Sequence, residues 1–287
     1  MNLFKKVEDY ASDFTTYPRT FEGYRWYKPL IIGALAIILY LVLCLGIITA
    51  VPMYNPDILY SSTNPSDFDS MAILTSIIIV LMVPSIYIPS RLLRERPFSS
   101  YLSSLGGWKW SVFIKSAAIS ILVFTLITIL QILIDGAHGE SSFTILTFIL
   151  CIIITPFQCF AEEYLCRGFL MQTFGSWFKI PVIAIILQAL IFTLLHQYNA
   201  IGLAEIFVSG FIFGFVTWYS KGLEVSSAIH TINNIFAFSL TGFGYAVATT
   251  EVSLIDFSVN VMTLAIILIL ILFADKKYDW FGFGDAK

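Results

Sequence analysis

Six residues suited to acid–base chemistry or hydrogen bonding lie inside segments otherwise apolar enough for a lipid bilayer: Glu162, Glu163, Arg167, His196, His230 and Asn234. A charged side chain at the bilayer centre costs at least ~2.5 kcal/mol, so such residues usually face an internal cavity and pair with one another. Carboxylates and imidazoles carry general acid–base catalysis, and they also bind catalytic zinc. These residues are therefore the first candidates for a catalytic site.

Helical spacing assigns different roles to the members of this cluster. Glu163 and Arg167 are four residues apart, so they share one face of a helix and can form a buried ion pair. Glu162 is rotated about 100° from Glu163 and is free to face another partner. The ordinary alternative is that these charges mark the cytoplasmic end of a membrane helix. His230 and Asn234 are also four residues apart and project from one face of a later helix.

The position of His196 favours a site over a helix end. Glu162 lies 17 residues before a turn expected near residue 179, and His196 lies 17 residues after it. In antiparallel helices the two residues reach the same height, so they can meet, and Phe192 can shield His196 from one turn away. His230 is harder to place, because it lies about 12 Å above its own turn whereas Glu162 lies about 25 Å above the turn near residue 179. Their heights agree only if the first hairpin protrudes about 13 Å further into the cytoplasm.

The elements that position these residues are membrane helices. The chain is 58% hydrophobic and only 12% charged, with a mean hydropathy of +0.85, which excludes a soluble globule. Apolar runs of about 20 residues predict about eight transmembrane helices. These runs cover residues 30–51, 71–88, 111–134, 143–160 with an extension, 180–195, 203–219, 225–240 and 257–274. Uninterrupted runs are typical of helices and not of barrel strands, so we expect an all-α fold.

The basic residues predict the orientation of these helices. If the N-terminus is cytoplasmic, all 16 Lys and Arg residues fall on the cytoplasmic side, and the opposite loops carry acids only. We therefore expect both termini in the cytoplasm. The organisation is then a cytoplasmic or interfacial segment (1–28), a single transmembrane domain (29–274) and a cytoplasmic tail (275–287). The first segment lacks the features of a signal peptide. Its aromatic residues predict either a segment along the membrane surface, broken at Pro18, or an aromatic belt entering the first helix.

Other candidate residues have ordinary explanations. The four cysteines lie in or next to apolar segments without metal-site spacing, which indicates packing residues. His138 is expected in a solvated outer loop. Tyr278-Asp279 and residues 282–285 match the YD and GxGD strings of aspartyl intramembrane proteases, but a charged tail cannot supply two facing membrane helices. We interpret this tail as an interfacial segment, and the sequence contains no phosphate-binding loop or nucleic-acid patch.

Taken in order, the polar residues resemble the motifs of a known family, the CPBP (CAAX-processing and bacteriocin-processing, or Abi) intramembrane proteases. The resemblance covers roughly residues 142–240 and rests on three motifs: Glu162-Glu163-x-x-x-Arg167, Phe192-x-x-x-His196 and His230-x-x-x-Asn234. It implies an intramembrane endopeptidase in which Glu162 and His196 activate water. His230 and Asn234 would stabilise the oxyanion, while the ion pair and Phe192 give support.

Two alternatives remain open at this point. Glu162, His196 and His230 could bind a catalytic zinc ion, although the HExxH arrangement is missing and we favour a metal-free glutamate mechanism without a cofactor. The chain could also be a non-hydrolytic protein of bacteriocin immunity or a regulatory scaffold. For the enzyme we expect a multi-pass protein of a prokaryotic plasma membrane. Its partners are then membrane lipid and a peptide or leader-peptide substrate, with no nucleic acid.

Overall fold

The structure is a computed structural model that describes residues 2–54, 65–136, 139–247 and 249–281. This part of the chain consists of helices and turns, which confirms the all-α fold. Two predictions, the solvated loop at His138 and the role of the 282–285 string, lie outside the described residues.

Each of the eight expected apolar runs is helical. The helices are α1 (Lys28–Tyr54), α2 (Pro65–Val80), α3 (Met82–Leu92), α4 (Ser99–Leu102), α5 (Trp110–Asp135), α6 (Ile145–Glu163), α7 (Gln172–Phe178), α8 (Pro181–Leu194), α9 (Ala200–Ser220), α10 (Glu224–Gly242) and α11 (Leu254–Tyr278). A π-helix, Tyr164–Met171, joins α6 to α7, so that these elements form one continuous rod.

Within the described residues, six of these segments are long and apolar enough to cross a membrane: 28–51, 73–92, 110–135, 145–178, 200–220 and 254–278. The expected run 71–88 is α2 and α3 placed end to end. Helix α8 has only 14 residues, and α10 carries several polar side chains, so neither belongs to the six. The count of eight spans and the cytoplasmic termini therefore stay predictions.

The residues in the turns determine where the helices that carry the candidate site begin and end. Lys179 adopts the left-handed conformation (φ 61°) after α7, and Pro181 occupies the first turn of α8, so the hairpin turns where it was expected. Lys221 is also left-handed (φ 60°) and separates α9 from α10. Asn199 caps α9 by accepting a hydrogen bond from the Gly202 amide at 2.8 Å. These turns fold α8, α9 and α10 back and forth, so that α8 and α9 contact the π-helix and α10 packs against α6.

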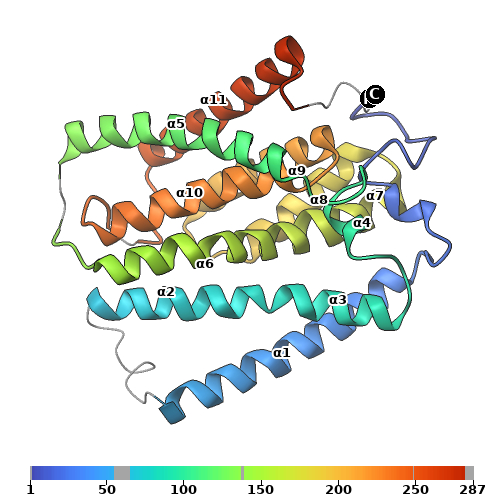
Figure 1. The fold of residues 1–287 in the computed structure, drawn as a ribbon, viewed down its shortest axis with the longest axis horizontal. Helices are drawn as coiled ribbons and strands as arrows, with labels where there is room; N and C mark the ends of the chain where they lie inside the picture. Colours follow the sequence, from blue (N-terminus) through green and yellow to red (C-terminus); the bar gives the residue numbers. More distant parts are fainter. Residues whose placement is uncertain (1, 55–64, 137–138, 248, 282–287) are drawn as a thin grey trace.

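Helix α10 lies between α5 and α6 in Figure 1, and α2 flanks α6 on its other side. One apolar cluster fills the space between α5, α9, α10 and α11, with Phe213 and Ile229 buried in it. A second cluster joins α1, α3, α4, the π-helix and α8. Helix α1 packs against α3 and then diverges from α2 along its length (Figure 1). The polar residues of α6 and α10 are thus placed at the centre of the bundle.

The segment before α1 packs against one end of this bundle. Phe14 is fully buried, and the Asp13 carboxylate accepts a 2.7 Å hydrogen bond from the Trp218 indole of α9. A 3-10 turn, Tyr17–Thr20, includes Pro18. Thr15 lies directly against Gly175 of α7, where an added Cβ would be 2.4 Å from the Thr15 Cβ. The segment is therefore held by both buried polar and close backbone contacts.

Candidate active site

The site begins where α6 changes from α-helix to π-helix. The π-helix starts at Tyr164, directly after the two glutamates, and such segments are frequent at functional sites. Arg167 Nη1 donates to Glu163 Oε1 at 3.0 Å, and both side chains are fully buried. This is the ion pair that the spacing of four residues predicts.

Neighbouring helices complete the environment of the Arg167 guanidinium. Its Nη2 donates to the Gly210 carbonyl of α9 at 3.1 Å. The guanidinium also lies 4.6 Å from the ring centroid of Phe192 in α8 and 5.3 Å from that of Phe213 in α9. Helices α8 and α9 approach closely at Gly210, where an added Cβ would be 3.1 Å from Phe192. Arg167 therefore ties the π-helix to the α8–α9 hairpin.

Glu162 has one partner of its own, Gln158, and shares His230 with Glu163. Its Oε1 accepts a 3.0 Å hydrogen bond from Gln158 Nε2, one helical turn earlier. Its Oε2 lies 3.7 Å from His230 Nε2, and the side chain keeps 12% of its surface exposed. Glu163 in contrast is closed off from solvent. Of the two carboxylates, Glu162 is the one that a substrate or water molecule can reach.

His230 bridges the two glutamates. Its Nδ1 is 3.0 Å from Glu163 Oε1, while its Nε2 faces Glu162 and lies 3.4 Å from the Asn234 amide nitrogen. The ring stacks on Phe213 with centroids 5.2 Å apart, and the residue is 4% exposed. A carboxylate only accepts hydrogen bonds, so Nδ1 donates its proton to Glu163. The Nε2 atom is then the one directed toward Glu162 and Asn234.

His196 lies just beyond the end of α8 and is half-buried. Its Nδ1 is 2.7 Å from the Phe192 carbonyl oxygen, and because a carbonyl only accepts, Nδ1 carries the proton. The Nε2 lone pair is therefore available for other contacts. Phe192 touches both imidazoles, with ring centroids 4.7 Å from His196 and 6.0 Å from His230. In the described part of the chain no hydrogen bond joins His196 directly to Glu162, so the expected meeting of the two residues stays a prediction.

The three residues considered for zinc do not converge on one point. In the described ranges no three His, Cys, Asp or Glu side chains are grouped so that they could hold a metal ion. Glu162 and His230 are adjacent, but His196 contacts Phe192 and Tyr198 instead of either one. The residues therefore do not fit a three-ligand zinc site of the kind found in zinc hydrolases.

Two polar residues of the site are not among the candidates that the sequence motifs indicate. Gln158 binds Glu162, and Gln188 of α8 donates to the Gly210 carbonyl at 2.8 Å, next to Arg167. The signal for Gln158 was available, because it lies four residues before Glu162 in an otherwise apolar helix.

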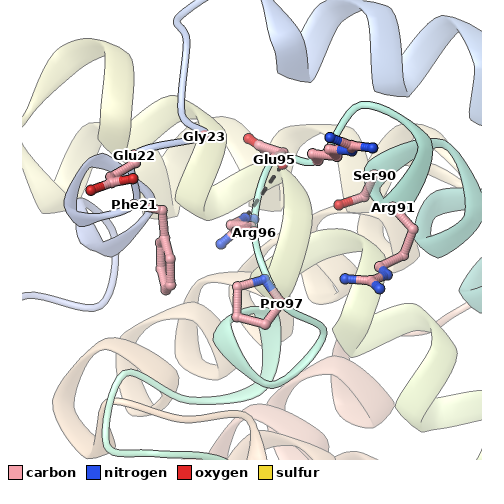
Figure 2. A pocket seen from close by; sticks show the side chains of 9 residues that line it. Phe21, Glu22, Gly23, Ser90, Arg91, Glu95, Arg96 and Pro97 are labelled. Carbon is pink, nitrogen blue, oxygen red and sulfur yellow. Dashed lines mark ion pairs between the residues drawn. The ribbon is translucent and has the colours of Figure 1, made fainter.

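A pocket of about 260 Å³ lies in another part of the protein (Figure 2). It is formed between the segment before α1 and the loop after α3, and Arg91, Arg94, Glu95 and Arg96 line it. The Glu95 and Arg96 side chains form an ion pair there with a 3.5 Å separation. This pocket includes none of the candidate catalytic residues.

Comparisons with known proteins bear on the same helices. The sequence model of a family described as type II CAAX prenyl endopeptidase Rce1-like matches residues 141–236, a range that holds all seven motif residues. The uncharacterized protein YyaK of Bacillus subtilis (strain 168) is 25% identical over 180 residues, which cover 57% of this chain. The matched region spans 58% of the length of YyaK. No solved structure matches the chain.

Proposed function

We propose that this chain, which belongs to the Rce1-like family through its residues 141–236, is an intramembrane endopeptidase. Its substrate is a membrane-associated peptide or protein. The observation that carries the proposal is the contact of His230 with both Glu162 and Glu163 inside an apolar helix bundle. A buried carboxylate–imidazole cluster of this kind is costly to maintain, and it supplies the groups that peptide hydrolysis needs.

Glu162 and His196 activate the attacking water in this mechanism. Glu162 Oε2 is not held by Gln158, and the His196 Nε2 carries a lone pair because Nδ1 donates to Phe192. Either atom can accept a proton from water. A water molecule between them would join the two residues that the structure does not join directly.

His230 and Asn234 stabilise the oxyanion of the tetrahedral intermediate. His230 Nδ1 already donates to Glu163, so a ring that also donates from Nε2 is an imidazolium. The carboxylates of Glu162 and Glu163 lie on either side to balance that charge. The Asn234 amide, 3.4 Å from Nε2, supplies a second donor at the same place. The Glu163–Arg167 ion pair holds the ring in this orientation.

A metal-dependent mechanism predicts a different measurement. Purified protein would contain stoichiometric zinc, and chelators would abolish its activity. The metal-free mechanism predicts sub-stoichiometric zinc by elemental analysis and full activity after chelation. Stoichiometric zinc together with chelator-sensitive activity would refute a role of Glu162 as the base that activates water.

The substrate and location are part of the proposal. The Bacillus relative supports a prokaryotic plasma membrane. A peptide or leader peptide then approaches the site from the cytoplasmic side.

Substitution of the two residues that activate water tests the proposal. Glu162→Gln or His196→Ala should abolish cleavage without lowering the amount of protein in the membrane. Mass spectrometry of membrane peptides should show species that accumulate in the Glu162→Gln and His196→Ala strains and not in the wild type. Glu205→Gln is a matched control, because Glu205 is another half-buried carboxylate in a membrane helix but binds Asn260 of α11. A regulatory scaffold or immunity protein predicts unchanged peptides and a phenotype that follows protein abundance.

A further inference from the structure

Gln158 is a buried amide in an apolar part of α6. Its side chain is 7% exposed, whereas the neighbouring Phe157 is 60% exposed on the outer surface of the same helix. A buried amide requires hydrogen-bond partners, because the loss of its water contacts is otherwise uncompensated. The partners of Gln158 therefore indicate what this residue does.

Two hydrogen bonds fix the orientation of the Gln158 amide. Its Nε2 donates to Glu162 Oε1 at 3.0 Å, and its Oε1 accepts from the Ser76 hydroxyl of α2 at 3.3 Å. A carboxylate cannot donate, so the nitrogen must be the atom that faces Glu162. The hydroxyl of Ser76, which is 6% exposed, favours the same orientation by donating to the amide oxygen.

This arrangement gives the two carboxylate oxygens of Glu162 different partners. Oε1 is held by the amide, and Oε2 is the oxygen that lies near His230. The carboxylate plane is thus set by a neighbour on its own helix, and only one oxygen is directed toward the catalytic group. Without the amide, rotation about the last torsion of Glu162 would exchange the two oxygens, because that torsion is broad and roughly two-fold.

We infer that Gln158 is a positioning residue for Glu162 and that Ser76 of α2 holds Gln158 in place. The inference rests on the proposed role of Glu162 as a base. It extends the functional unit beyond residues 141–236, because Ser76 belongs to a helix outside the range that matches the family.

Two substitutions separate positioning from packing. Gln158→Met keeps the length and volume of the side chain but has no donor. Gln158→Glu restores a donor only when the introduced carboxyl is protonated, because two adjacent carboxylates share one proton at low pH and repel each other when both are ionised. Ser76→Ala removes the hydroxyl that donates the outer hydrogen bond to Gln158.

The kinetic readout is cleavage of an internally quenched farnesylated CAAX peptide by the purified full-length protein in detergent. Gln158→Met should lower kcat roughly ten- to hundredfold with KM unchanged, the effect expected from loss of one hydrogen bond to a charged group. Gln158→Glu should be close to wild type near about pH 6 and lose activity steeply by about pH 8, where wild type stays active. Ser76→Ala should fall between wild type and Gln158→Met. An equal loss of kcat in both Gln158 variants, with the same pH profile as wild type, would overturn the inference.

A double-mutant cycle keeps the inference testable if the peptide is not cleaved. Gln158→Met and Glu162→Gln are combined, and the Tm of each purified variant is measured. If Gln158 acts through Glu162, the Tm loss of the double variant is smaller than the sum of the single losses. Additive losses overturn the inference. Absence of cleavage by wild type, together with non-additive Tm losses, argues against the proposed function and leaves the contact between Gln158 and Glu162 established.

Discussion

The ion pair between Arg167 and Glu163 allows a quantitative test of how the site is held together. Arg167→Met removes the guanidinium while keeping most of the apolar stem. Glu163 then stays fully buried. It has lost its ion pair with the guanidinium and keeps its contact with His230. The Gly210 carbonyl loses the Arg167 donor but keeps the one from Gln188.

The expected loss of stability follows from these contacts. Removing one partner of a buried ion pair costs about 3–5 kcal/mol, because the other charge is left uncompensated. The Arg167 side chain is 0% exposed, so solvent screening does not reduce this value. The two aromatic contacts of the guanidinium are lost as well, each worth about 0.5–2 kcal/mol. These losses together amount to about 4–9 kcal/mol. At roughly 2–4 °C per kcal/mol for a domain of this size, the Tm should fall by roughly 10–35 °C.

Thermal unfolding of the purified protein in detergent, followed by tryptophan fluorescence, measures this change. The matched control is the double variant Arg167→Met with Glu163→Gln, in which both charges are absent. The double variant should recover at least about 2 kcal/mol relative to Arg167→Met alone, because removing both charges costs much less than leaving one unpaired. The Tm losses of Arg167→Met alone and of Glu163→Gln alone are compared with that of the double variant. If the two single losses are small and simply add in the double variant, the ion pair does not stabilise the site, and the reasoning is wrong.

Two further predictions concern the end of the bundle near residue 222. Burial raises the pKa of Glu224 to about 7 from its ordinary value of 4.5, so folding takes up a proton and stability falls as pH rises between these values, by about 3 kcal/mol in total. Glu224→Gln should flatten this dependence in Tm scans across pH, and an unchanged slope would contradict the assignment. Gly175→Val should displace the segment before α1, because its side chain would overlap the backbone of Thr15. Limited proteolysis should then cut that segment faster than in Gly46→Val, a control position where an added Cβ would meet no atom of another element within 4 Å.

The sequence predicts some contacts of the site well and others poorly. The Glu163–Arg167 pair follows from a spacing of four residues, which depends only on local helix geometry. Local helix geometry could not fix the depth of His230 in the membrane. His230 reaches the height of Glu162 only if the α7–α8 hairpin extends further into the cytoplasm than the start of α10. The contact of His230 with both glutamates shows that the two helices do meet.

The expected meeting of Glu162 and His196 rests on counting residues at a constant rise, and it stays a prediction. The turn at Lys179 is where it was expected, but the helix between Glu162 and that turn includes the π-helix Tyr164–Met171. A π-helix has a wider turn than an α-helix, so a constant rise per residue does not apply across it. Helix α8 also ends at Leu194, which places His196 in the following turn, where its ring packs on Phe192.

The sequence by itself determines that this is an all-helical membrane protein, where its apolar helices lie, and which polar residues belong together. Those properties depend on composition and on local periodicity, which need no knowledge of neighbouring helices. Only the tertiary structure decides which oxygen of Glu162 accepts the hydrogen bond from Gln158 and which one lies near His230. It also decides that His230 contacts both carboxylates and that Ser76 binds Gln158. These contacts depend on how distant helices rotate and slide against one another, and packing of the whole bundle fixes that arrangement.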